Sequence, residues 1–331
     1  MNKVIILNKR PQGKPTLEDF KITSEESPTI NEGEILLKTV YVSVDPYLRG
    51  RMNDTKSYVP PFELNKPIVS GIIAEVTESK HPDLKKGAFV SGMLEWKEYQ
   101  TSNGKHLQQV DATEAKLSSY LGILGMTGLT AYLGLTEIGV PKNGETLVVS
   151  GAAGAVGTVV GQVGKLLGCN VIGITGSDEK AALLKSTFNF DETINYKTTP
   201  NLREAVKRAC PDGVDIYFDN VGGEISDAVL VNINKYARLI VCGGISVYNE
   251  TEMPTGPRLQ PLILTKSATM RGFIINDFSD KFPAATKQLT GWLQDEKLTY
   301  SETIVEGFEN IPQAFLDLFN GKNKGKMIVK I

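Results

Sequence analysis

A glycine-rich segment is the clearest place in the sequence where residue type and spacing could support chemistry. Gly151-Ala152-Ala153-Gly154-Ala155-Val156-Gly157 follows the apolar run Thr146–Ser150 and precedes a helix-compatible stretch. Small residues at such a turn let backbone N–H groups approach a pyrophosphate, which then lies at the positive end of the helix. Gly154 and Gly157 fill the second and third glycine positions of the G-x-G-x-x-G pattern, and Ala152 replaces the first. A tight turn without a ligand could have the same composition, but the strand–turn–helix setting favours a dinucleotide site.

The end of the next predicted strand bears on which nicotinamide cofactor is used. NAD enzymes usually carry an acidic residue there, which binds the ribose 2′-hydroxyl. Here the strand ends in Ile174-Thr175-Gly176, and Ser177-Asp178-Glu179-Lys180 follows. Ser177 is a candidate helix N-cap, and the Lys180 ammonium could meet a 2′-phosphate or simply be solvated. The residues favour NADPH over NADH.

Two further loops follow predicted strands and should face the same ligand. Asp219-Asn220-Val221-Gly222-Gly223 comes after the fourth strand of this region, and Cys242-Gly243-Gly244-Ile245-Ser246 comes after the fifth. Ligands bind outside the carboxyl ends of parallel strands. Turn chemistry is an alternative explanation for the first of these loops, and the two glycines of the second could simply end a strand. The Cys242 thiol could be reactive, although a small packed side chain is the simpler interpretation.

Composition excludes several classes of protein. The 331 residues include only two histidines and three cysteines, and no two of these residues stand at metal-ligand spacing, so we expect no metal site. Unpaired cysteines fit a reducing compartment, and the cytoplasm is the expected location. The net charge of −2 argues against a nucleic-acid partner, and no apolar run approaches membrane-spanning length.

The rhythm of apolar segments predicts two domains. Residues 1–120 read as short strands separated by Gly and Pro, which indicates a mostly β domain. Residues 121–299 alternate apolar strands with helical segments, which indicates a doubly wound parallel sheet of the Rossmann type, with strands covered on both faces. The last of these strands is expected at Thr269–Phe273. Residues 300–331 end in one more strand, which we expect to complete the first domain.

Several segments in this order resemble one family. They are Ser43-Val44-Asp45-Pro46-Tyr47-Leu48-Arg49-Gly50, Gly125-Met126-Thr127-Gly128-Leu129-Thr130-Ala131-Tyr132, the turn at 151–157, Gly176–Lys180, Asn195-Tyr196-Lys197, Tyr217–Glu224 and Gly325-Lys326. Together they resemble the zinc-independent medium-chain dehydrogenase/reductases, in particular the prostaglandin reductases and 2-alkenal (double-bond) reductases, or leukotriene B4 12-hydroxydehydrogenases. The resemblance covers nearly the whole chain and implies a GroES-like first domain. Zinc-binding relatives carry Gly-His-Glu where this chain has Gly71-Ile72-Ile73.

The resemblance also implies a set of cofactor-binding residues. Gly154 to Gly157 would hold the pyrophosphate, Lys180 the 2′-phosphate, and Tyr196 the adenosine end. The remaining implied residues line the nicotinamide side or close the site: Asn220, Cys242, Gly243, Gly244, Ile245, Ser246, Val247, Tyr248, Phe273, Ile274, Ile275 and Asn323. The family further implies a homodimer formed through the nucleotide domains.

A metal-free reduction of an activated double bond is the chemistry that these residues favour. Hydride delivery to the β-carbon of an α,β-unsaturated aldehyde or ketone places negative charge on the carbonyl oxygen, which hydrogen-bond donors stabilise. We expect Tyr248 to be such a donor, assisted by the nicotinamide ribose hydroxyl, with Tyr47 as a second pocket candidate. The alternatives are an NADPH-dependent quinone oxidoreductase and a non-catalytic NADPH-binding or sensor protein.

Overall fold

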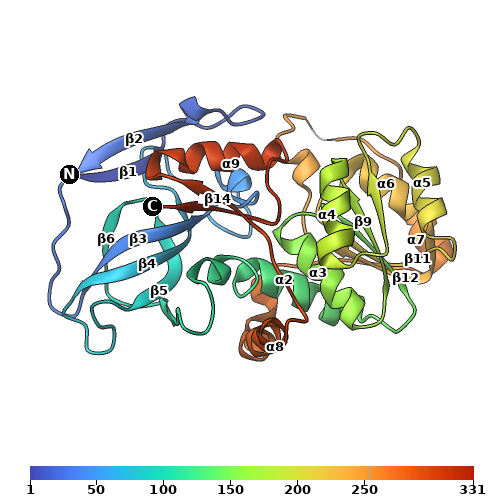
Figure 1. Cartoon of the computed structure of the whole chain (residues 1–331). Helices are drawn as coiled ribbons and strands as arrows, with labels where there is room; N and C mark the ends of the chain where they lie inside the picture. Colours follow the sequence, from blue (N-terminus) through green and yellow to red (C-terminus); the bar gives the residue numbers. More distant parts are fainter. Residues whose placement is uncertain (253) are drawn as a thin grey trace. The chain divides into compact units, whose positions relative to one another are not determined.

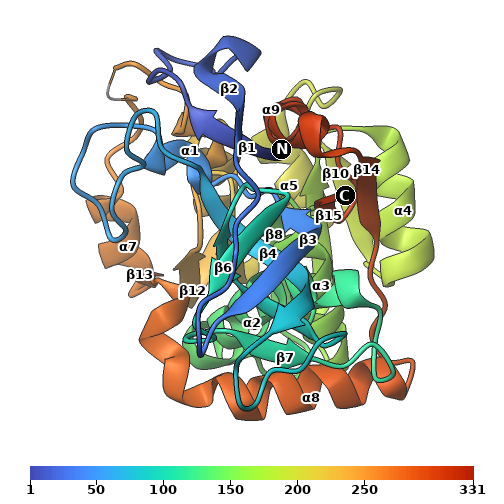
Figure 2. The same ribbon diagram turned by 90° about the vertical axis from the view of Figure 1, so that its left-hand side faces the viewer.

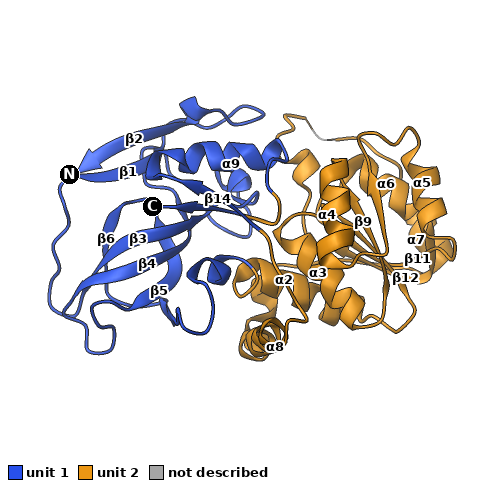
Figure 3. Ribbon diagram, viewed as in Figure 1, with its two compact units in different colours: residues 1–122, 302–323, 327–331 blue, residues 123–301, 324–326 orange. Residues whose placement is uncertain are grey.

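The computed structural model describes residues 1–252 and 254–331, which form two compact units (Figure 3). The β-rich unit comprises residues 1–122, 302–323 and 327–331. The α/β unit comprises residues 123–301 and 324–326. Each unit has its own sheet and its own buried core. Within the described part of the chain, no helix combines the length and the apolar character that crossing a membrane requires.

The α/β unit is built on a six-stranded sheet in the order β10-β9-β8-β11-β12-β13. Figure 1 labels β9, β11 and β12 of this sheet. Every pairing in it is parallel. This order is the doubly wound one, with the switch point between β8 and β11, and it confirms the predicted fold class. The strands are β8 (Thr146–Ser150), β9 (Asn170–Thr175), β10 (Glu192–Asn195), β11 (Val214–Asp219), β12 (Ile233–Val241) and β13 (Thr269–Gly272).

Helices cover both faces of this sheet. Successive strand residues point to opposite sides, and apolar side chains on both sides need to be buried. Leu147 and Val171 face α3 at Gly164, whereas the neighbouring Val148 and Ile172 join the core beneath α5, α6 and α7. The helices of the unit are α2 (Met126–Gly134), α3 (Ala155–Leu166), α4 (Asp178–Phe188), α5 (Leu202–Ala209), α6 (Gly223–Leu230), α7 (Gln260–Lys266) and α8 (Phe282–Gln294). Shorter helical turns are η3 (Leu135–Gly139), η4 (Ile245–Val247) and η5 (Ile275–Lys281).

Strand β13 differs from the sequence prediction. The prediction covered it on both faces, but all four of its residues are exposed, and it forms the edge of the sheet beside β12. The preceding helix α7 also exposes an apolar side chain, since Leu264 is 79% exposed. This edge is therefore open in the single chain.

The β-rich unit contains a seven-stranded sheet and a two-stranded one (Figure 2). The larger has the order β14-β15-β3-β4-β5-β7, with β6 also paired to β3, and β1 pairs with β2. Its strands are β3 (Ile35–Ser43), β4 (Val69–Ser79), β5 (Phe89–Glu95), β6 (Tyr99–Ser102), β7 (Gln108–Val110), β14 (Glu302–Glu306) and β15 (Lys326–Lys330), and the hairpin is β1 (Asn2–Leu7) with β2 (Phe20–Glu25). The pairs of β3 with β4, β6 and β15 are antiparallel, as predicted for a mostly β domain.

One C-terminal helix completes the core of the β-rich unit. Phe315 of α9 (Ile311–Phe319) meets the Phe20 ring edge-on at 6.1 Å, and Phe20 stacks on Trp96 at 6.3 Å. The Trp96 indole donates to Ser70 Oγ at 2.8 Å, so its polar atom is satisfied within the core. The other helical segments are η1 (Leu17–Asp19), α1 (Leu48–Arg51), η2 (Leu117–Leu121) and η6 (Phe308–Asn310).

Candidate nucleotide-binding site

The predicted phosphate-binding turn leads from β8 into α3. Gly154 is the N-cap of α3 in an extended conformation, and it has no side chain that could cap the first helical N–H groups. A Cβ atom on Gly157 would lie 2.5 Å from the Gly151 carbonyl oxygen, so only glycine fits this close helix–turn contact. The helix start is therefore open to an anion, as a pyrophosphate requires.

A C-terminal segment lies directly against this turn. Gly325 N–H donates to the Ala153 carbonyl at 2.8 Å, and Gly325 and Gly154 form a parallel bridge. Gly325 has a φ of +65°, and a Cβ there would stand 1.9 Å from the Ser301 carbonyl oxygen. Residues 324–326 are thus fixed beside the turn by backbone contacts that sequence reasoning did not predict.

A buried carboxylate organises the loop after β11. Asp219 Oδ1 accepts hydrogen bonds from Ser150 Oγ and Tyr217 Oη, each at 2.8 Å. It also accepts from the N–H groups of Val221 and Gly222 at 3.0 and 2.9 Å. Asp219 is 5% exposed, so these charge-assisted bonds hold the loop in one conformation.

Asn220, a predicted cofactor residue, is positioned by the same network. Its backbone N–H donates to Ser150 Oγ at 2.9 Å, and its side-chain amide donates to the Ser150 carbonyl at 2.8 Å. The backbone carbonyl of Asp219 accepts from the N–H groups of Cys242 and Gly243 at 2.9 and 3.1 Å. One aspartate therefore joins the ends of β8, β11 and β12.

The predicted adenosine end gathers around the start of α4. Ser177 is its N-cap and accepts from Lys180 N–H at 3.3 Å, as predicted. Asn195 at the end of β10 donates its side-chain amide to Asp178 at 2.7 Å, which links the end of β10 to the first residue of α4. The Tyr196 ring lies over Gly176, since a Cβ there would stand 3.1 Å from the ring.

Positive charge is concentrated at this end of the site. Burial lowers the pKa of the Lys180 ammonium, and the nearby charge of Lys197 lowers it further. Lys324 adds to this effect, and Glu179 opposes it. The carboxylate of Asp178 is engaged by Asn195, so the groups that surround Lys180 are suited to an anionic 2′-phosphate more than to a neutral ribose hydroxyl.

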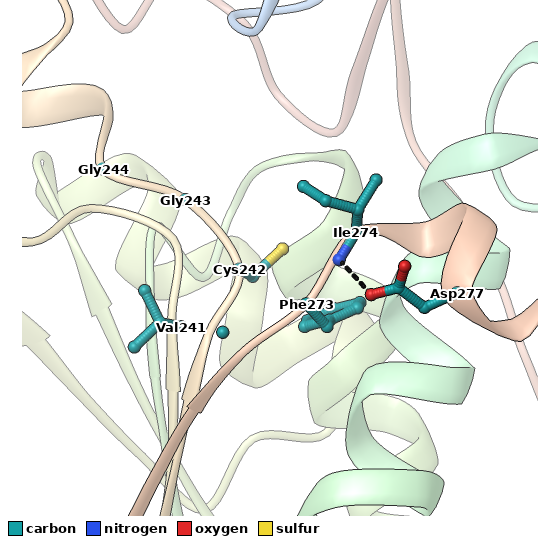
Figure 4. A pocket seen from close by; sticks show the side chains of 8 residues that line it. Val241, Cys242, Gly243, Gly244, Phe273, Ile274 and Asp277 are labelled. Atoms are coloured by element: carbon teal, nitrogen blue, oxygen red, sulfur yellow. Dashed lines mark hydrogen bonds between the residues drawn. The ribbon is translucent and has the colours of Figure 1, made fainter. Parts of the chain in front are cut away.

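A cavity of about 500 Å³ lies at the carboxyl ends of β12 and β13 (Figure 4). Eight residues line it: Val241, Cys242, Gly243, Gly244, Gly272, Phe273, Ile274 and Asp277. Of these, Cys242, Gly243, Gly244, Phe273 and Ile274 were predicted site residues. The structure therefore brings together the loop that follows β12 and the loop that follows β13. Asp277 was not predicted; its carboxylate accepts from Ile274 N–H at 3.1 Å and fixes that loop.

Tyr248 and Cys242 lie at the same strand end. The Tyr248 hydroxyl accepts a hydrogen bond from the N–H of Gly244 at 3.3 Å. Burial raises the pKa of Tyr248, which keeps its proton available for donation. Burial also raises the pKa of the Cys242 thiol to about 12, and Asp219 adds to that shift. The neutral thiol favours a packing role for Cys242.

Two known sequence families match separate parts of the chain. Residues 3–110 match an N-terminal domain of oxidoreductases, and residues 155–291 match the zinc-binding dehydrogenase family. YfmJ of Bacillus subtilis, named as an NADP-dependent oxidoreductase, is 56% identical to this chain. The match covers 99% of this chain and 97% of the length of YfmJ. The tobacco 2-alkenal reductase (NADP(+)-dependent) is 42% identical over 100% of this chain and 97% of its own. The crystal structure of CurA from Vibrio vulnificus in complex with NADPH is 43% identical, with a TM-score of 0.95 over 99% of this chain and 98% of its own.

The chain belongs to the prostaglandin reductase and 2-alkenal reductase family. This confirms the family resemblance and makes the protein an NADP-dependent oxidoreductase with a small-molecule substrate. NADP(H) is its cofactor, and the open helix start, the glycine at 157 and the cations around Lys180 fit that molecule. Among the described residues, no group of three or more His, Cys, Asp and Glu side chains could hold a metal ion.

Most predicted site residues of this reductase lie in the α/β unit, after successive strands of one sheet. Tyr47 and Asn323 belong to the β-rich unit. Tyr47 precedes helix α1 and packs against the core of that unit. Burial raises its pKa, and the nearby Asp45 charge contributes. Arg49 of the same motif is a structural residue, because it is 2% exposed and donates to the Gly13 carbonyl at 2.8 Å.

The sequence did not predict the residues that hold the loops of the site in place by hydrogen bonds. Ser150 and Asp219 are the last residues of β8 and β11, and polar residues at buried strand ends were the available signal. Asp277, also missed, lies three residues after the N-cap Ile274 of η5, and its carboxylate accepts from the Ile274 N–H. No local pattern could have placed residues 324–326 beside Ala153, because that contact joins distant parts of the sequence.

Proposed function

We propose that this protein uses NADPH to reduce the carbon–carbon double bond of α,β-unsaturated aldehydes and ketones. The observation that carries the proposal is the Tyr248 hydroxyl, 3.3 Å from the backbone nitrogen of Gly244, which itself lines the cavity at the strand ends. That position supplies a protonated donor at the border of an apolar cavity. The name of the 42% identical tobacco relative agrees with this substrate class.

The chemistry requires a donor for developing charge. Bound NADPH supplies a hydride for the β-carbon and a ribose hydroxyl near the nicotinamide. The electrons of the double bond then move to the carbonyl oxygen, giving an enolate, and the Tyr248 O–H donates to this oxygen. A proton from water adds at the α-carbon and completes the saturated carbonyl product. Because its pKa is raised, Tyr248 stays neutral and acts by hydrogen bonding.

Different predicted residues would bind different parts of the cofactor. Gly154, Ala155, Val156 and Gly157 would hold the pyrophosphate, while Lys180 and Tyr196 would bind the 2′-phosphate and the adenosine. The rest would surround the nicotinamide half: Asn220, residues 242–248, residues 273–275 and Asn323. Tyr47 would contribute to the substrate pocket through an aromatic face and a hydroxyl, since it is only partly buried.

The test is to follow NADPH absorbance with 2-alkenals, aryl enones, oxo-prostanoids and quinones, and to repeat each assay with NADH. We expect turnover of enals and enones, with the saturated carbonyl as product and a strong preference for NADPH. Quinone turnover without enone turnover would replace the proposed substrate class. Tight NADPH binding without any oxidation would identify a sensor instead.

We also propose a homodimer formed through the α/β units. Strand β13 has an open edge, all four of its residues are exposed, and Leu264 nearby is 79% exposed. An open edge of a sheet with apolar neighbours is a surface that a second copy can pair with.

We further propose a cytoplasmic location for the enzyme. Cys169, Cys210 and Cys242 are all free thiols in the described structure, which suits a reducing compartment. Fractionation of source cells with an antibody against the protein tests this, and recovery in an oxidising compartment contradicts it.

A further inference from the structure

Lys324 lies at the point where the C-terminal segment reaches the phosphate-binding turn. The bond from Gly325 N–H to the Ala153 carbonyl, at 2.8 Å, fixes the backbone on one side of this lysine. The bond from Lys326 N–H to the Ser301 carbonyl, at 2.9 Å, fixes the backbone at Lys326. The backbone around Lys324 is therefore held by the contacts of the two residues that follow it.

The side chain of Lys324 reaches the first turn of α4. Its ammonium pairs with Glu179, which directly precedes Lys180 in the sequence. This ion pair places the Lys324 ammonium at the turn of α4 that also carries Lys180, and its positive charge contributes to the lowered pKa of Lys180. Lys197, one residue after Tyr196, is the other lysine that affects Lys180. Three cations thus come from α4, from the end of β10 and from the C-terminal segment.

Three cations at one end of the site repel one another, and a bound anion would offset that repulsion. Glu179 supplies one carboxylate, but its side chain is 72% exposed, and an exposed ion pair contributes little. A phosphate monoester carries nearly two negative charges and several acceptor oxygens. It would therefore offset more of this positive charge than the Glu179 carboxylate can.

We propose that Lys324 is a specificity-determining residue for the cofactor's 2′-phosphate, paired with Glu179 in the free protein and transferred to the phosphate when the cofactor binds. The inference rests on the proposed role of Lys180 at that phosphate. Residues 324–326 would then have two roles. Their backbone supports the pyrophosphate-binding turn, and the side chain of Lys324 distinguishes NADPH from NADH.

Calorimetric binding of 2′,5′-ADP and of 5′-AMP to the full chain separates these tasks without measuring catalysis. Lys324→Met should weaken 2′,5′-ADP binding by about tenfold, the loss of one charge-assisted hydrogen bond, and leave 5′-AMP binding unchanged. Glu179→Gln should strengthen 2′,5′-ADP binding by about two- to threefold, because the carboxylate no longer competes for Lys324. Lys185→Met is the matched control: it removes another lysine of α4 and its 2.8 Å pair with Glu192, and should change neither affinity.

The Lys180→Met variant distinguishes failure of this inference from failure of the proposed phosphate site. If Lys180→Met leaves 2′,5′-ADP binding unchanged, the 2′-phosphate does not bind at α4. The proposed phosphate site and the proposed role of Lys324 are then both wrong. If Lys180→Met weakens that binding and Lys324→Met does not, only the role of Lys324 is wrong. Equal weakening of 2′,5′-ADP and 5′-AMP by Lys324→Met would show a structural effect and would also overturn the inference.

Discussion

At the scale of single residues, Tyr248 carries the proposed chemistry. Its hydroxyl accepts from Gly244 N–H at 3.3 Å, and burial keeps it protonated. Tyr248→Phe should lower kcat on a small enone by about 100-fold, the effect of losing one donor to a developing oxyanion. Steady-state kinetics at saturating NADPH measure this change.

The control for that substitution is Tyr236→Phe, which removes the hydroxyl of a tyrosine that is 64% exposed on β12. We expect it to retain the parental kcat. NADPH affinity should be nearly unchanged in Tyr248→Phe, since the aromatic ring still fills its place on the loop. A Tyr248→Phe enzyme with parental turnover would falsify the donor role, while leaving the reductase assignment intact.

Lys180 gives the site a pH dependence whose sign follows from its lowered pKa. Phosphate binding favours the charged ammonium, so the pKa of Lys180 is higher in the complex than in the free protein. Affinity for 2′,5′-ADP should be greatest below the free-protein pKa and should fall as the pH rises through it. Because burial and Lys197 lower that pKa, the fall should begin before the usual lysine range.

The measurement is the dissociation constant of 2′,5′-ADP between about pH 7 and pH 10, the range below the ordinary lysine pKa. Lys180→Arg should move the fall to higher pH, since a guanidinium keeps its charge throughout. The affinity for 5′-AMP should show no matching fall. If wild type and Lys180→Arg have the same pH profile, Lys180 does not control the binding.

At the scale of secondary-structure elements, Ser150 is the junction between β8 and β11. Its hydroxyl donates to Asp219 at 2.8 Å and accepts from Asn220 N–H at 2.9 Å, and its side chain is fully buried. Ser150→Ala should lower the free energy of unfolding by about 1–3 kcal/mol, because the Asn220 N–H loses its partner. NADPH affinity should fall as well, since Asn220 keeps only one of its two hydrogen bonds to residue 150.

Chemical denaturation and NADPH titration of the Ser150→Ala variant test this. Ser186→Ala on the exposed side of α4 is the control, and should change the unfolding free energy by less than about 0.5 kcal/mol. A Ser150→Ala protein with the stability of the parent would mean that the strand ends are held by other contacts.

The elements themselves were largely predictable, because their patterns are local. The apolar runs at 146–150 and 214–219 coincide with β8 and β11, and Ser177 is the N-cap that its sequence predicts. The contacts between elements were not predictable to the same degree. Asp219 reads only as a turn residue, and nothing near Gly325 indicates Ala153 as its partner. These contacts depend on the parallel sheet and on the return of the C-terminal segment, which no short window of sequence contains.

At the scale of the whole molecule, the error at β13 is informative. The segment Thr269–Phe273 was predicted to be a strand covered on both faces, although Met270 and Phe273 are its only apolar residues. In the structure its four strand residues are exposed, because β13 is the last strand in the sheet order. The strand residues Thr269-Met270-Arg271-Gly272 include a charged side chain, so their composition fits an exposed edge and the prediction was wrong. The proposed dimer therefore rests on the open edge and on the exposed Leu264.

The dimer prediction can be tested at that edge with charged substitutions. Leu264→Asp combined with Met270→Asp places two carboxylates on side chains that are 79% and 38% exposed in the single chain. Burying unpaired charge in an interface is strongly unfavourable, so the double variant should dissociate into monomers while the parent has twice the mass of one chain. Met93→Asp, on β5 of the β-rich unit and 55% exposed, is the matched control and should stay dimeric. Light scattering after size-exclusion chromatography gives the mass of each. A parent that is monomeric at micromolar concentration, or a double variant that stays dimeric, contradicts pairing through β13.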